Sequence, residues 1–200
     1  MRKIPLLFCA LALLCVSASA QELSKANREK GVKYLEETRD GVVAAVSGLS
    51  DAQMHFKSAP DRWSVAECLE HIALAEDFIF MNVSQNIMKA GPGAADRDVA
   101  KTDAAVLAMI PDRSHKATAP PQLLPTGRWT PDETLKHFLA SREKTIEFMK
   151  STPDLRAHVV DSPIGQPLDA YEWLLFIGAH SKRHTEQIDE VKADPNFPKS

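Results

Sequence analysis

The sequence predicts an all-α protein built from four long helices. Three segments open with the same capping pattern, a Ser, Thr or Asp followed three residues later by Glu: Ser64–Glu67, Thr130–Glu133 and Asp169–Glu172. Four segments carry apolar residues at the three- and four-residue spacing of an amphipathic helix, and none shows the alternation of a strand. The recurrence of one helix-start signal together with one periodicity indicates the all-α class.

The first two helices are expected over residues 24–48 and from Ser64 to about Lys89. The first has apolar positions along one face and ends at Gly48-Leu-Ser-Asp. The second carries one apolar face and a second band that includes His71, Leu74, Phe78 and Met81. Because a helix that is apolar on two sides is more buried than a surface helix, we expect it near the centre of a bundle.

The third and fourth helices follow a long connection. Residues 91–129 are rich in Pro and Gly, with a short amphipathic piece over residues 99–110, and predict a crossover from one end of the bundle to the other. The third helix begins at Thr130 with Pro at its first position, carries Arg142 on its buried side and stops at Pro153. The fourth begins at Asp169 and runs to about Lys192.

The first 20 residues are predicted to be a signal peptide. Arg2 and Lys3 precede an apolar run over residues 6–16, and Ala18-Ser-Ala20 fits a cleavage site. The run is too short for a comfortable membrane span, and no later stretch is long and apolar enough for one. We therefore expect an exported protein, periplasmic or extracellular after cleavage near Ala20, in which residues 21–200 form a single domain.

The composition of the mature chain limits the classes of partner and ligand that can be expected for it. Cleavage leaves 22 basic and 27 acidic residues, so the net charge moves from −3 to −5, which gives no support to a nucleic-acid partner. Cys68 is the only cysteine outside the leader, which excludes an intramolecular disulfide. A small-molecule substrate or ligand is expected, and the sequence leaves open whether the chain forms a homodimer through an outer apolar face.

Two histidines, His180 and His184, lie one turn apart in the fourth helix. They share one helical stripe with four apolar residues: Trp173, Ile177, Ile188 and Val191. A histidine pair at this spacing can chelate one metal ion. The Glu of the zinc-peptidase H-E-x-x-H pattern is absent, so a peptidase is not predicted and any third ligand has to come from elsewhere in the fold.

His71 is the candidate third ligand, because it lies two turns into the second helix on the band shared with Leu74. Three imidazoles from two helices leave coordination positions open for water or substrate, as in catalytic metal sites. The alternative is that all three are core histidines hydrogen-bonded to neighbours, although burying three uncompensated imidazoles costs on the order of several kcal/mol. Glu67, one turn before His71, is interpreted as the cap of its helix, with a role as general base or as a hydrogen-bond partner of a metal ligand as the alternative.

Two further groups of side chains receive a plainer interpretation. Gln187, one turn after His184, can hydrogen-bond a ligand, but the plainer interpretation is that it borders the apolar stripe. The other four histidines are interpreted as solvated surface groups: His55, His115, His137 and His158.

These motifs resemble the DinB-like superfamily. The resemblance rests on Gly48-Leu-Ser-Asp-Ala-Gln, Trp63-Ser-Val-Ala-Glu-Cys-Leu-Glu-His and His180-Ser-Lys-Arg-His, and covers roughly residues 25–192. The family includes thiol-dependent S-transferases and mycothiol-dependent maleylpyruvate isomerases. The resemblance implies a four-helix bundle with long crossover connections and a divalent metal ion held by His71, His180 and His184.

The resulting hypothesis is an exported metal-binding protein, with zinc or nickel favoured by all-imidazole ligation. In a metal-dependent transferase or hydrolase, the ion would activate a bound water or thiol as nucleophile, with Glu67 as the candidate base. The first alternative is a non-catalytic helical bundle that holds a small ligand or a partner. The second is a bundle without a metal.

Overall fold

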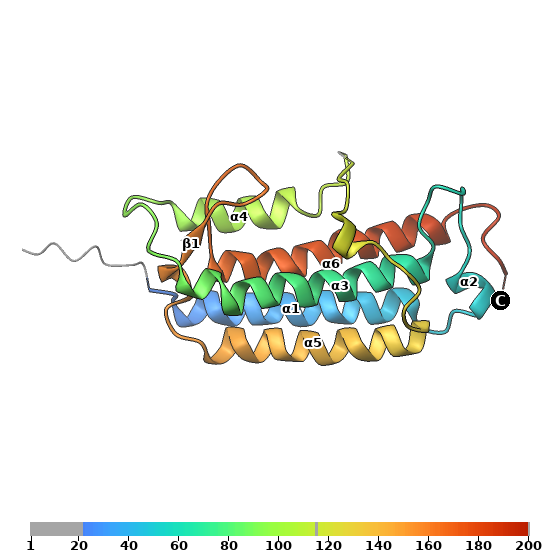
Figure 1. The fold of residues 1–200 in the computed structure, drawn as a ribbon, viewed down its shortest axis with the longest axis horizontal. Coiled ribbons are helices and arrows are strands. Elements are labelled where there is room, and N and C mark those ends of the chain that lie inside the picture. Colours follow the sequence, from blue (N-terminus) through green and yellow to red (C-terminus); the bar gives the residue numbers. More distant parts are fainter. Residues whose placement is uncertain (1–21, 115, 200) are drawn as a thin grey trace, which may run out of the picture.

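The computed structural model describes residues 22–114 and 116–199 as a helical bundle (Figure 1). The predicted signal peptide and His115 lie outside the described residues. The four long helices are α1 (Lys25–Val46), α3 (Val65–Gln85), α5 (Pro131–Ser151) and α6 (Ala170–Lys192). The shorter elements are α2 (Asp51–Met54), η1 (Ile87–Lys89), α4 (Val99–Met109), η2 (Pro121–Leu123), η3 (Leu155–Ala157), β1 (Val159–Val160) and β2 (Leu168–Asp169). The predicted all-α four-helix bundle is confirmed.

Local capping sets where the long helices begin. Ser64, Thr130 and Asp169 each accept a hydrogen bond from the backbone N–H of a Glu three residues later, and that Glu side chain accepts one from the N–H of the cap residue. Helix α1 begins with half of this arrangement, because Ser24 accepts from the N–H of Asn27. These contacts involve only neighbours in sequence, which is why the starts could be predicted from it.

The order of helices around the bundle explains the long connection. Helices α1 and α3 each pack against both α5 and α6. The long helices α1 and α3, which are consecutive in the chain, therefore lie diagonally across the bundle from each other. In Figure 1, α1 and α6 run in one direction, and α3 and α5 in the other. Because α3 and α5 are parallel neighbours, the chain has to return along the bundle between them, and α4, packed on α6, makes part of that return.

The structure differs from the sequence-based expectation in small elements. Helix α2 was not predicted, although Ser50 and Gln53 form a capping box. The ladder of β1 with β2 pairs only two residues on each side, too few to leave an alternating pattern. Helix α3 ends at Gln85, before the end near Lys89 that the following Gly and Pro residues predicted, and η1 occupies the remaining residues. Phe78 and Met81, which the second apolar band predicted to be buried, are 40% and 47% exposed. Among the described residues, no helix combines the length and apolarity that crossing a membrane requires.

A buried ion pair at the centre connects all four long helices. Arg142 of α5 is completely buried and donates to both carboxylate oxygens of Glu76 in α3, at 2.7–3.1 Å. Its Nη1 donates to the backbone oxygen of Leu35 and to Thr38 Oγ1 in α1, both at 2.9 Å. Its Nη2 donates to Ser181 Oγ in α6 at 2.7 Å. The two buried charges of this pair therefore compensate each other, and removing one member would leave the other uncompensated.

We expect Arg142→Met to lower the free energy of unfolding by about 3–5 kcal/mol, because Glu76 is then left buried without its counter-charge. Urea unfolding at pH 7 measures this. The double variant Arg142→Met/Glu76→Met should be less destabilised than Arg142→Met alone, and the exposed Lys144→Met should change stability by no more than about 0.5 kcal/mol. A loss below about 1 kcal/mol for Arg142→Met would show that the pair does not hold the bundle together.

Candidate metal centre

The packing of α3 against α6 brings three predicted histidines together. His71 lies in the second turn of α3, and His180 and His184 lie in the middle of α6. The Nε2 atoms of His71 and His180 are 3.3 Å apart, and each of the three rings offers one nitrogen within 4.8 Å of the other two. In residues 22–114 and 116–199, this is the one group of three or more His, Cys, Asp or Glu with such convergence.

Hydrogen bonds on the far side of two rings direct their Nε2 atoms into the cluster. His71 Nδ1 lies 2.8 Å from the backbone oxygen of Leu123, in the connection between α4 and α5. A carbonyl oxygen only accepts, so Nδ1 carries the hydrogen and Nε2 keeps its lone pair. His184 Nδ1 lies 2.9 Å from Gln187 Oε1, one turn further along α6. The alternative role of Gln187, as hydrogen-bond partner of a cluster histidine, is thus the one the structure shows.

The spacing of the nitrogens fits a metal ion. Two nitrogens bound tetrahedrally to zinc, each about 2.05 Å from the ion, lie about 3.3 Å from one another. The separation between the Nε2 atoms of His71 and His180 has this value. With three nitrogen donors, at least one coordination position is left for water or substrate. The cluster therefore fits a divalent metal ion.

Burial keeps the imidazoles neutral, which is the form that binds a metal. His71 is 2% exposed and His184 8% exposed, while His180 is partly exposed. Loss of hydration lowers the pKa of His71, although the bond to Leu123 opposes it. Burial, with repulsion from His71, lowers the pKa of His184 to about 3. Burial and the two neighbouring histidines hold the pKa of His180 well below its usual value.

Aromatic rings border the cluster. The ring centroid of Trp63 lies 4.7 Å from that of His71 and 6.1 Å from that of His184. On α6, the ring of Phe176 is nearly parallel to that of His180, with centroids 6.4 Å apart. These apolar surfaces limit hydration of the imidazoles, which is consistent with their lowered pKa values.

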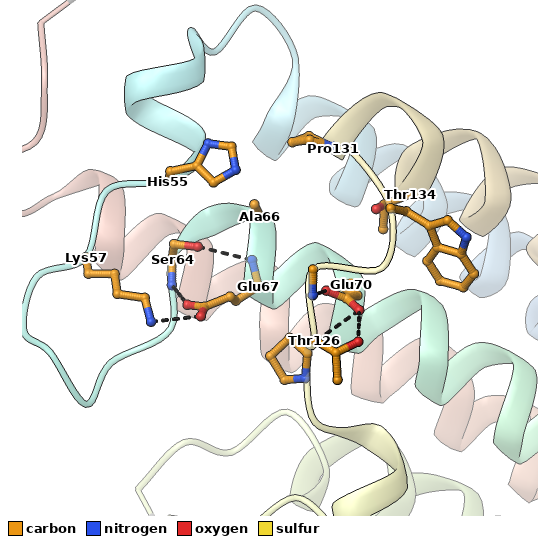
Figure 2. A pocket seen from close by; sticks show the side chains of 12 residues that line it. His55, Lys57, Ser64, Ala66, Glu67, Glu70, Thr126, Pro131 and Thr134 are labelled. Carbon is orange, nitrogen blue, oxygen red and sulfur yellow. Dashed lines mark hydrogen bonds and ion pairs between the residues drawn. The ribbon is translucent and has the colours of Figure 1, made fainter.

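Glu67 acts as a helix cap in the structure. Its Oε2 accepts from the N–H of Ser64 at 2.7 Å, and its Oε1 lies 2.7 Å from Lys57 Nζ (Figure 2). It lines a pocket of about 370 Å³ that none of the three cluster histidines borders. The capping interpretation of Glu67 is confirmed, and its role as a catalytic base stays a prediction.

The contacts by which α3 holds the crossover connection were not predicted from the sequence. Glu70, next to His71, is buried and accepts from the backbone N–H groups of Thr126 and Gly127 at 3.1 and 2.8 Å (Figure 2). Together with the bond from His71 to Leu123, this fixes the connection against the helix. Hydrogen bonds to backbone atoms far along the chain require no particular residue type there, so they leave no motif.

The other described histidines lie outside the cluster. His137 Nε2 is 2.6 Å from Asp77 Oδ2, and its side chain is 37% exposed. His158 Nδ1 donates to the backbone oxygen of Ala90 at 2.8 Å. Both therefore make specific contacts where solvated rings were expected, while His55 is exposed.

The fold and the cluster define a class of protein, a four-helix bundle with a three-histidine arrangement that fits a metal ion between two antiparallel helices. The family model of the DinB superfamily matches residues 34–188. The chain belongs to the DinB superfamily, which confirms the resemblance seen in its motifs.

Two proteins of Bacillus subtilis are similar to this chain. The uncharacterized protein YuaE of strain 168 is 28% identical over 149 residues, which are 74% of this chain and 88% of YuaE. The structure of YfiT superimposes with a TM-score of 0.60 at 15% identity, covering 88% of this chain and 91% of that one. YfiT is described as "a probable metal-dependent hydrolase with an unusual four-helix bundle topology". At this identity the likeness supports the fold.

We expect the metal-free protein to lose stability as the pH falls from about 6.5, the pKa of an unfolded histidine, towards 4. Folding holds the pKa of His184 at about 3, so in this range the unfolded chain binds a proton that the folded protein does not. The contribution of the neutral His184 to the free energy of unfolding is therefore fully present above pH 6.5. Below that pH the free energy of unfolding falls by about 1.4 kcal/mol per pH unit for each histidine whose pKa folding lowers in this way. Urea unfolding in the presence of a chelator measures this.

The variant His184→Gln, which removes one such group, should show a smaller decrease over the same range. A pH dependence equal in both proteins would contradict a lowered pKa at His184.

Proposed function

We propose that the protein is a metal-dependent hydrolase whose ion is held by His71, His180 and His184. The observation that carries this proposal is the convergence of three imidazole nitrogens within 4.8 Å of one another. All-nitrogen ligation and the tetrahedral spacing favour zinc, with nickel as the alternative. The description of YfiT as a probable metal-dependent hydrolase supports the same class of reaction.

The residues of the chain prepare this chemistry before any metal binds. Helices α3 and α6 carry the three rings, and Leu123 and Gln187 hold the hydrogen of His71 and His184 on Nδ1. A divalent ion held there would supply a Lewis acid, whose chemistry is to make a bound water more acidic. Because three neutral imidazoles contribute no negative charge, the ion would keep its full charge for this task.

Glu67 is assigned no step in this proposal. Its carboxylate is engaged by the backbone of Ser64 and by Lys57, and it faces a pocket that the histidines do not line. A base acting on a metal-bound water has to lie within hydrogen-bond reach of it. The capping contacts account for Glu67 without such a role.

We expect the protein, purified without a histidine tag, to take up about one equivalent of zinc or nickel, measured by mass spectrometry of the metal. Replacing His71, His180 or His184 by Ala should each lower the affinity by more than about 100-fold, since even the residues that orient such ligands contribute 10- to 100-fold. His137→Ala, which alters a histidine outside the cluster, is the matched control and should bind as the wild type does.

Activity is tested on a panel of ester, amide and phosphoester substrates. We expect hydrolysis that a chelator abolishes and added zinc restores. Full folding with less than a tenth of an equivalent of metal after reconstitution would contradict the metal site. Full loading without turnover on any substrate class would instead favour the non-catalytic alternative, a bundle that binds a ligand or partner.

Export of the protein is the second part of the proposal. It rests on the sequence of residues 1–20, with its basic start, apolar run and Ala-Ser-Ala site. In a bacterial host, we expect mature protein outside the cytoplasm whose N-terminal residue is Gln21, measured by fractionation and intact mass. Ala18→Arg and Ala20→Arg should leave the leader attached, because cleavage requires small residues there. Intact full-length protein in the cytoplasm would contradict export.

A further inference from the structure

A chain of side chains behind His184 connects the metal centre to the crossover connection. Gln187 Oε1 lies 2.9 Å from His184 Nδ1 and 3.4 Å from Arg113 Nη1. Arg113 lies just after α4 in the chain. Its side chain contacts α6, which is far away in sequence. Its Nε and Nη2 donate to the two carboxylate oxygens of Glu190 at 2.7 and 2.6 Å.

We propose that Gln187 is a positioning residue of the metal centre and that Arg113 fixes its amide group so that His184 presents Nε2 to the ion. The proposal deepens, and rests on, the proposed metal-dependent function. Gln187 and Arg113 act through His184 and do not themselves contact the ion.

The chemistry of the donors determines where each hydrogen lies. A guanidinium only donates hydrogen bonds, so the Gln187 atom that faces Arg113 has to be the amide oxygen. The same oxygen faces His184 Nδ1, and an oxygen without a hydrogen can only accept. Nδ1 therefore carries the hydrogen of the neutral ring, and Nε2 is left with the lone pair that a metal requires. Without Arg113, rotation of the amide could turn its NH₂ group towards the ring and favour the opposite tautomer.

Glu190 makes this arrangement rigid. Its two oxygens bind Arg113 in the paired geometry that is specific to guanidinium and carboxylate groups. Gln187 and Glu190 are three residues apart on α6 and so lie on one side of the helix. The side chain of Arg113 is only 20% exposed, so its guanidinium is held in a defined position.

The crossover connection thereby supports two ligands by separate routes. Leu123 fixes the ring of His71 through its backbone oxygen, and Arg113 fixes the ring of His184 through Gln187. Both residues belong to the connection between α4 and α5. Partners of this kind commonly contribute 10- to 100-fold to the metal affinity of a site, because they select the tautomer and orient the ring.

The test compares two replacements of Gln187 with similar size. We expect Gln187→Met, which cannot accept the hydrogen bond, to lower zinc affinity about 10- to 100-fold. Gln187→Glu, which accepts through a carboxylate, should bind zinc with an affinity no more than about threefold below that of the wild type. Competition with a chromophoric chelator measures both. Gln85→Met, the same substitution at an exposed end of α3, is the matched control and should leave the affinity unchanged.

A second measurement reports the tautomer and does not depend on the metal. In zinc-free protein, ¹⁵N NMR of the His184 ring should show the hydrogen on Nδ1 in the wild type and in Gln187→Glu. In Gln187→Met, a mixture of tautomers is expected. Arg113→Met should lower zinc affinity by a smaller factor than Gln187→Met and shift the same resonances part of the way, because the amide remains but is free to rotate.

These outcomes separate the positioning role from the metal function. If Gln187→Met keeps wild-type zinc affinity within threefold and its Nδ1–H tautomer, the positioning proposal is overturned while the metal site stands. Equal losses in Gln187→Glu and Gln187→Met would also overturn it, because packing alone would then explain them. If the wild type binds neither zinc nor nickel, the proposed function fails, and the NMR result still decides whether Gln187 sets the tautomer.

Discussion

The arrangement of the four helices depends on the buried guanidinium of Arg142. It reaches Glu76 in α3, Leu35 and Thr38 in α1, and Ser181 in α6, so one side chain of α5 contacts every other long helix. A buried charge tolerates little displacement of its partners, because each lost hydrogen bond leaves a polar group without water. The hydrogen bonds of Arg142 to three other helices therefore constrain how the helices lie relative to one another, in addition to the packing of their apolar side chains.

The positions of the three histidines depend on how the ion pair holds α3 and α6 relative to each other. Ser181, which binds Arg142, is next to His180, and Glu76 lies on the helix that carries His71. A ligand nitrogen has to be placed within a few tenths of an ångström to bind a metal well, which side chains on packed helices achieve better than those on loops. The 3.3 Å between the Nε2 atoms of His71 and His180 is thus a property of how α3 and α6 are held together.

The topology of the bundle supplies the rest of the site. Parallel neighbours α3 and α5 require the chain to return along the molecule (Figure 1), and the return places the backbone oxygen of Leu123 against His71 and Arg113 against Gln187. Leu123 and Arg113 come from this return, while Glu70 binds it from α3. A connection that the helix order makes necessary thus also contacts His71 directly and His184 through Gln187. The superfamily assignment and the likeness to YfiT agree with this fold.

The sequence by itself determined the four long helices, their starts, the crossover and the three histidines. Each of these depends on neighbours in the chain: a cap such as Ser64 with Glu67, or two histidines one turn apart. Gln187 lies only three residues from His184, so its hydrogen bond to that ring was within reach of the sequence pattern, but the pattern favoured a position bordering the apolar stripe. The tertiary structure decided that Arg142 meets Glu76, and that backbone at Leu123 orients His71. Such contacts join groups that the chain separates by more than 50 residues and that any sequence pattern treats as independent, so only the packing of the helices could bring them together.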